Sequence, residues 1–127
     1  MPRIMVDMSA VLIHHGHIRI LKEASMLGDV VVALTSDDEI ITKKNIIPEL
    51  EFEHRKEILM AIQYVDEVVS SNWLIDDDFL IEHNIDLLIH GDDNSNVVPP
   101  EKLKTIPRTT GVSTSDIRKR VLKNLRE

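Results

Sequence analysis

Hydrophobic and polar positions alternate with two different periods along the chain. Short apolar runs bounded by polar residues predict four β-strands, at residues 3–6, 30–36, 65–70 and 85–91. The run VVVALTS at residues 30–36 is continuous and rich in β-branched side chains. Such a run is typical of a strand that is covered on both faces, as in a parallel sheet.

Between these strands, apolar residues recur at helical spacing. The pattern predicts helices over residues 16–27, 51–63, 76–84 and 113–125. The first helix carries Ile18, Leu21 and Ala24 on one face, and Gly28-Asp29 is expected to close it. The last helix is expected to begin at a cap formed by Ser113 or Ser115. Its expected buried stripe consists of Ile117, Val121, Leu122 and Leu125.

Two polar stretches complete the pattern. Residues 37–48 join the second strand to the second helix, and residues 92–111 are expected to be mostly loop, with a short helical turn after Pro99-Pro100. The order of elements predicts the α/β class, with a single doubly wound parallel sheet in one domain over residues 1–127. In such sheets, ligands bind beyond the carboxyl ends of the strands.

Composition narrows the classes of protein that are possible. The chain has no cysteine, which excludes disulfides, thiolate metal ligands and a thiol nucleophile. The 22 acidic residues outnumber the 15 basic ones, so general nucleic-acid binding is not expected. An anionic ligand therefore needs a local site that overrides the global field.

The apolar runs also bear on location. The longest contain about five residues, whereas a membrane span needs roughly 18 or more. The N-terminal sequence MPRIMVDMSA lacks the long apolar segment of a signal peptide. With the absence of cysteine, this leads us to expect a cytoplasmic protein.

Three histidines lie where the first loop turns into the first helix, in the sequence HHGH at residues 14–17. Packing or solvent exposure is one interpretation. A metal site is another, but no acidic ligand follows His14 and His17 at the next helical position, and a closed site needs three or four ligands. The third interpretation is phosphate binding. Gly16 would let a phosphate approach the backbone, and two imidazoles at a helix N-terminus can donate hydrogen bonds to a phosphoryl transition state.

The connection RTTGVSTS, residues 108–115, suggests the same chemistry. A glycine and hydroxyl residues at a helix N-terminus offer backbone N–H groups and the positive end of the helix dipole to an anion. Arg108 adds a fork that matches phosphate oxygens. The alternative interpretation is an ordinary N-cap.

These segments together resemble the cytidylyltransferase family, whose members act on glycerol 3-phosphate, choline phosphate or ethanolamine phosphate. HHGH, ALTSDD, EFEHRKEIL, YVDEVV, IDLLIHGDD and RTTGVSTSDI occur in the family's order across almost the whole chain. HxGH alone is a weak signal, because class I aminoacyl-tRNA synthetases and pantetheine-phosphate adenylyltransferases have related motifs. Its combination with RTxGxSTSxI at this chain length is specific.

The resemblance implies a Rossmann-like nucleotidyltransferase fold and the transfer of CMP from CTP to a small phosphorylated alcohol, with release of pyrophosphate. The implied catalytic residues are His14, His17, Lys44 and Arg108. The other implied nucleotide-binding residues are Ser9, Ala10, Gly16, Gly91, Asp92, Asp93, Thr109, Gly111, Ser113 and Thr114. His15 falls at the variable position of the first motif.

Three further residues match family positions near the acceptor: Lys43, Arg55 and Trp73. Alternatives from the residues themselves stay open, since Arg55 could pair with an acid at a helix start and Trp73 could be core. The resemblance implies no protein ligand for a metal, because Mg²⁺ would arrive with the nucleotide. It also implies a homodimer, with the segment AIQYVDEVV at residues 61–69 and the first-motif loop near the interface.

The sequence departs from the family at four positions. Met8, Ala10 and Val11 stand where the family usually has glycine, an aromatic residue and aspartate, and Gln63 stands where it tends to have arginine. Two other hypotheses therefore remain beside an active cytidylyltransferase. One is a nucleotide-binding homologue with weak or lost catalysis, and the other is an adenylyltransferase on the same fold.

Overall fold

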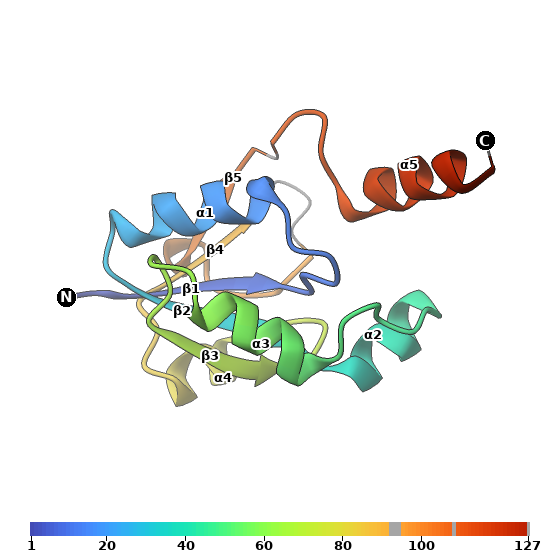
Figure 1. Cartoon of the computed structure of the whole chain (residues 1–127). Helices are drawn as coiled ribbons and strands as arrows, with labels where there is room; N and C mark the ends of the chain where they lie inside the picture. Colours follow the sequence, from blue (N-terminus) through green and yellow to red (C-terminus); the bar gives the residue numbers. More distant parts are fainter. Residues whose placement is uncertain (92–94, 108, 127) are drawn as a thin grey trace.

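The computed structural model describes residues 1–91, 95–107 and 109–126, and it contains one five-stranded sheet (Figure 1). The strands are β1 (Arg3–Met8), β2 (Asp29–Thr35), β3 (Glu67–Ser71), β4 (Leu87–Gly91) and β5 (Leu103–Ile106). All pairings are parallel and the spatial order is β3-β2-β1-β4-β5. The prediction of a parallel α/β sheet is therefore confirmed.

The direction of winding reverses between β1 and β4, because β2 and β3 lie on one side of β1 whereas β4 and β5 lie on the other. Ligands of open α/β sheets bind beside such a reversal, at the carboxyl ends of the two strands. This rule directs attention to the residues that follow Met8 and Gly91.

Helices cover both faces of the sheet. The helices that the structure describes are α1 (His15–Ser25), α2 (Asp37–Lys44), α3 (Phe52–Met60), α4 (Asp77–Glu82), the 3₁₀ turn η1 (Pro100–Lys102) and α5 (Thr114–Arg126). Leu21 of α1 and Leu59 of α3 join the buried cluster on one face, and Leu80 of α4 joins the cluster on the other. None of the described helices is long and apolar enough to cross a membrane.

Two elements lie in segments that we expected to be irregular. The polar stretch after β2 contains α2. Ser36 caps its start, because the Ser36 hydroxyl accepts a hydrogen bond from the Glu39 N–H. Only Ile40 of this helix is buried, so the apolar pattern is too weak to reveal it. The stretch after β4 contains the expected turn η1 and also the unexpected strand β5, a short edge strand with no fully buried residue.

The expectation that Gly28-Asp29 closes the first helix was wrong. Helix α1 ends at Ser25, and Met26 caps it in a right-handed conformation. Gly28 has a different role, because a Cβ at this position would lie 2.2 Å from the carbonyl oxygen of Pro2. The Asp29 N–H donates to the same oxygen. Glycine here allows the chain start to lie against the beginning of β2.

The expected buried stripe of the last helix was also wrong. Figure 1 shows α5 standing clear of the sheet, with the C-terminus at its far end. Val121, Leu122 and Leu125 are exposed, and no residue of α5 is buried. Helical spacing of apolar residues predicts an amphipathic helix, but it does not say what covers the apolar face.

The two kinds of apolar position predict very different costs of truncation. Leu34→Ala, at a fully buried position in β2, should lower the free energy of unfolding by about 2–5 kcal/mol. Leu125→Ala, at a position that is 80% exposed, should change it by less than about 0.5 kcal/mol. Urea denaturation of the two variants measures both values. A large loss in the Leu125 variant would show that the apolar face of α5 is covered in solution.

Candidate active site

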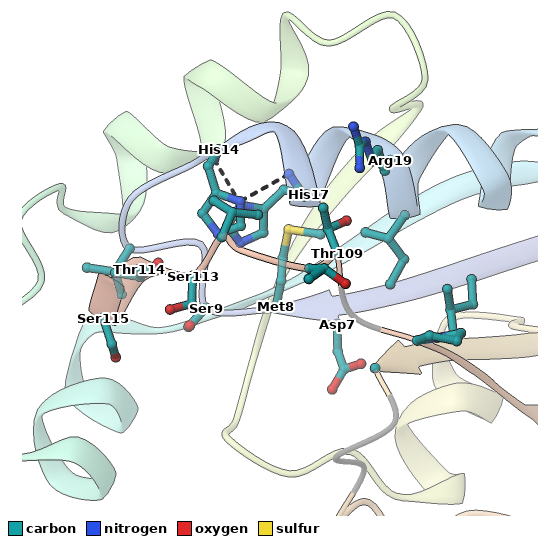
Figure 2. A pocket seen from close by; sticks show the side chains of 18 of the residues that line it. Asp7, Met8, Ser9, His14, His17, Arg19, Thr109, Ser113, Thr114 and Ser115 are labelled. Carbon is teal, nitrogen blue, oxygen red and sulfur yellow. Dashed lines mark hydrogen bonds between the residues drawn. The ribbon is translucent and has the colours of Figure 1, made fainter. Parts of the chain in front are cut away.

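Two adjoining cavities open at the carboxyl ends of β1 and β4. The larger has a volume of about 560 Å³ and the smaller about 340 Å³. They share one wall, formed by Asp7, Met8, Ser9, His17 and Lys44. Figure 2 shows residues of the larger cavity arriving from the end of β1, from the start of α1 and from the start of α5. The site thus lies at the reversal of the sheet.

His14 and His17 cap the start of α1 with their own rings. His14 precedes the helix, and its Nδ1 accepts a hydrogen bond of 3.1 Å from the Gly16 N–H. The Nδ1 of His17 accepts one of 3.0 Å from the His14 N–H. This reciprocal arrangement satisfies two backbone donors that a helix start otherwise leaves without partners. The HxGH motif therefore forms a capping box built from two imidazoles.

Burial determines the charge of both rings, and the capping bonds determine which ring nitrogen carries the proton. Burial lowers the pKa of His17 to about 4, and the neighbouring His14 acts in the same direction. Burial, with a smaller effect of His15, also lowers the pKa of His14. Both rings are neutral at pH 7, and each Nδ1 is an acceptor, so the single ring proton is on Nε2. Each histidine is thus prepared to donate one hydrogen bond from Nε2.

Gly16 is required by its neighbours in the motif. A Cβ at this position would lie 2.8 Å from the His14 ring. The sequence suggested that the glycine leaves room for a phosphate, whereas in the structure that room is taken by the His14 imidazole. Any larger residue would displace the ring that caps the helix.

The start of α5 forms the opposite wall of the larger cavity. Thr109, Ser113, Thr114 and Ser115 line it. The Ser113 hydroxyl accepts a hydrogen bond from the Asp116 N–H, which confirms Ser113 as a cap. The Thr114 hydroxyl donates to the carbonyl of Leu12, two residues before His14. This contact joins the two segments that were interpreted as phosphate-binding, across about a hundred residues of sequence.

Gly111 lies in the turn that precedes α5. Its φ of +82° is in the left-handed region, where glycine is the favoured residue. No atom of the described residues lies within 4 Å of where its Cβ would be, so the backbone conformation explains the glycine. The turn directs the chain from β5 back over the cavity.

Arg55 is the largest fully buried side chain that the structure describes. Its guanidinium donates to the carbonyls of Leu50, Ser9 and Thr35 at 2.6–2.9 Å. It also forms an ion pair of 2.6 Å with Asp37 at the start of α2. Arg55 therefore faces inward, as the alternative from the sequence held, and it lines neither of the two cavities. It positions the loop after β1, where the cavities meet.

The smaller cavity contains a nearly buried carboxylate. Asp7 accepts hydrogen bonds from Nδ1 of His90, on β4, and from the side-chain amide of Asn96. Only 8% of its side chain is exposed. Trp73 lines the same cavity, and Lys44 Nζ lies 5.5 Å from the centre of its ring. The cavity thus offers an anion, a cation and an aromatic face within one small volume.

The structure gives the location of most of the other residues that the sequence assigned to the site. Ser9 and Lys44 line both cavities, and Gly91 lines the larger one. Ala10 is buried, with a φ of +47° in the turn after β1, and it lines neither of the two cavities. Lys43 is exposed on α2. Asp92, Asp93 and Arg108 lie outside the described residues.

Four charged residues that line the larger cavity were not assigned to the site from the sequence: Asp7, Arg19, Glu23 and Arg118. The sequence does contain a signal for Asp7, because this polar residue directly follows the predicted first strand. Arg19, Glu23 and Arg118 lie on helices among many charged neighbours, so the sequence alone does not distinguish them. The departures Met8 and Val11 also line the larger cavity.

The described residues hold no group of three or more His, Asp or Glu side chains arranged for a metal ion. Among the described residues, the carboxylates that line the larger cavity are Asp7, which is already hydrogen bonded, and Glu23. Such a donor set suits a divalent cation that is held mainly by the phosphates of a nucleotide.

Comparison with known proteins decides the family. A family model described as cytidylyltransferase-like matches residues 12–106. The chain belongs to this family. The matched segment contains the HxGH motif, β2 to β5 and Trp73, and it ends just before the turn that leads into α5.

Curated relatives share much of the sequence. The chain is 39% identical to a glycerol-3-phosphate cytidylyltransferase of Bacillus subtilis, over 87% of this chain and 89% of that protein. It is 37% identical to an ethanolamine-phosphate cytidylyltransferase of Arabidopsis thaliana, over 98% of this chain but only 33% of that protein. The chain therefore matches about a third of the ethanolamine-phosphate relative.

A solved structure supports the fold. A lipopolysaccharide core biosynthesis protein from Thermoplasma volcanium superposes with a TM-score of 0.65 at 20% sequence identity. The match covers 96% of this chain and 87% of that one. At this identity the likeness bears on the fold alone.

The buried histidine predicts how stability depends on pH. Unfolded His17 binds a proton near pH 6.5, whereas in the folded protein it stays neutral down to about pH 4. The unfolded state therefore binds more protons in this window, and the free energy of unfolding should fall by about 2 kcal/mol from pH 7 to pH 5. Urea denaturation at the two pH values measures the fall. His17→Gln keeps an acceptor for the His14 N–H and should show a smaller fall; an equal one would contradict the assignment.

Proposed function

We propose that the protein transfers CMP from CTP to a small phosphorylated alcohol and releases pyrophosphate. One observation carries the proposal: the neutral, capped pair His14 and His17 faces the hydroxyl-rich start of α5 across a cavity of about 560 Å³. Membership of the cytidylyltransferase-like family and the names of the curated relatives support the same reaction.

The reaction needs no covalent intermediate with the protein. A phosphate oxygen of the acceptor attacks the α-phosphorus of CTP, and the bond from that phosphorus to the bridging oxygen of the β-phosphate breaks. Pyrophosphate leaves with the electron pair of that bond. The protein therefore contributes position and charge stabilisation.

Each group of the larger cavity has a role in this scheme. The Nε2–H groups of His14 and His17 donate to oxygens of the α- and β-phosphates, where negative charge grows in the transition state. The first turn of α5 and the hydroxyls of Ser113 and Thr114 hold the terminal phosphates. Lys44, on the wall that the cavities share, neutralises charge between the acceptor phosphate and the α-phosphate. A magnesium ion bound to the triphosphate would add further neutralisation.

The smaller cavity is the acceptor site in this proposal, because it adjoins the nucleotide cavity along the wall that holds Lys44. Its Asp7 carboxylate and Trp73 ring favour an acceptor whose far end is an ammonium, as in a phosphorylated or phosphonylated amino alcohol. Glycerol 3-phosphate is the second candidate, favoured by the 39% identical relative and by the ability of Asp7 to accept hydrogen bonds from hydroxyls.

We also propose that the protein is a cytoplasmic homodimer, with residues 61–69 near the interface, as the family resemblance suggests. This segment comprises the connection that follows α3 and the first part of β3. Sedimentation at several protein concentrations tests the oligomeric state.

The reaction is tested by incubating the protein with each of the four nucleoside triphosphates and a panel of acceptors while pyrophosphate is measured. Release that requires both CTP and an acceptor is expected. His14→Asn and His17→Asn should each lower kcat by about 10²–10³-fold, the range for losing one donor to a developing charge. His15→Asn, at the exposed position between them, is the matched control. Binding of CTP without pyrophosphate release would support a nucleotide-binding protein. Acceptor-dependent release of pyrophosphate with ATP but not with CTP would support an adenylyltransferase.

The identity of the acceptor is tested at Asp7. Asp7→Asn removes the charge but keeps a polar side chain of the same size. With ethanolamine phosphate as the best acceptor, KM for this acceptor should rise on the order of tenfold, whereas KM for CTP should change much less. Equal KM values for glycerol 3-phosphate and ethanolamine phosphate in the wild-type protein, both insensitive to the substitution, would remove Asp7 from the acceptor site.

A further inference from the structure

Arg118 is a cation of the larger cavity that the proposed mechanism does not use. It lies one helical turn beyond Thr114 and Ser115, and all three residues line the cavity. Residues three and four positions apart share one face of a helix, so Arg118 continues the surface formed by the hydroxyl residues. Its guanidinium is therefore attached to the same wall that would hold the terminal phosphates.

The guanidinium is engaged by a carboxylate of the same chain. Nε and Nη2 of Arg118 donate to Oε1 and Oε2 of Glu49, both at 2.6 Å. Glu49 belongs to the segment that connects α2 to α3. The hydrogen bonds from Arg118 hold the pKa of Glu49 below its usual range, so the pair is fully charged at neutral pH. A two-pronged contact of this kind is also the way in which arginine binds phosphate.

The pair is well formed but accessible. The side chains of Arg118 and Glu49 are 32% and 42% exposed. Exposed pairs contribute little to stability, because water and salt screen them. A nucleoside triphosphate carries more negative charge than a carboxylate. It would contact Arg118 and, at the same time, the hydrogen-bond donors of the first turn of α5. Exchange of Glu49 for a phosphate is therefore favourable once the cavity is filled.

We propose that Arg118 binds the terminal phosphates of the nucleotide, and that Glu49 is an internal competitor which holds the guanidinium while the cavity is empty. This inference rests on the proposed function, since it takes the larger cavity as the triphosphate site. Glu49 mimics the ligand, so its removal strengthens triphosphate binding and its presence sets a lower affinity than the site can reach.

A purely structural ion pair makes the opposite prediction for one of the two partners. If the pair only ties α5 to the segment before α3, then removing either residue loosens the same wall, and both substitutions weaken binding. In the competitor arrangement the two substitutions have opposite signs. The sign of the Glu49 effect therefore separates the two explanations without depending on its size.

The experiment measures binding of inorganic triphosphate and of CTP by calorimetry, and kcat and KM for CTP in the pyrophosphate assay. Arg118→Gln should weaken triphosphate binding on the order of tenfold, the loss of a charge-assisted contact. Glu49→Gln should strengthen it by about two- to fivefold, which is the worth of the exposed pair. The double variant should bind like Arg118→Gln alone, because Glu49 has nothing left to compete for.

Glu53→Gln is the matched control, because it removes one negative charge from an exposed position on the first turn of α3. It should leave the affinity near that of the wild-type protein. Weaker binding in Glu49→Gln, or an equal gain in Glu53→Gln, would overturn the inference. Opposite signs for triphosphate binding without any pyrophosphate release would support the inference while contradicting the proposed reaction. A wild-type protein that binds neither probe would overturn both.

Discussion

The buried guanidinium of Arg55 is the contact on which the site depends. It joins α3 to the loop after β1, to the end of β2 and to the start of α2, through Ser9, Thr35 and Asp37. A buried charge is tolerated only when its hydrogen bonds are satisfied, and here backbone carbonyls and one carboxylate supply them. Ser9 lies on the wall common to both cavities, so the core of the protein sets the position of that wall.

The HxGH motif serves folding and chemistry with the same atoms. Each ring uses Nδ1 to satisfy a backbone N–H at the start of α1, and this leaves Nε2 as a donor. Burial keeps the rings uncharged, so each ring can donate a hydrogen bond from Nε2 without adding a positive charge to the site. The start of α1 and the proposed anion site are thus built from one set of contacts.

The sequence predicted the parallel sheet, because strong apolar runs are a local signal. It also suggested phosphate binding for both the first and the last motif, since ligands of such sheets bind beyond the carboxyl ends of the strands. It did not predict α2 or β5, where few side chains are buried, nor the exposed face of α5. The hydrogen bonds of Asp7 with His90 and Asn96 join residues more than eighty positions apart, and such partners follow only from the fold. The pairing of Arg118 with Glu49, 69 positions apart, also follows only from the fold.

The shared wall has a consequence for how substrate preference diverges among related chains. Met8 and Ser9 line both cavities, so in the proposed scheme a substitution at either position can alter the binding of both substrates. Trp73, His90 and Asn96 line the smaller cavity only. In the proposed scheme, substitutions at these positions can change the preferred acceptor while they leave the nucleotide cavity unchanged. The architecture therefore separates an evolvable half from a constrained one, and relatives that use different phosphorylated alcohols are expected to differ chiefly on the side of Trp73.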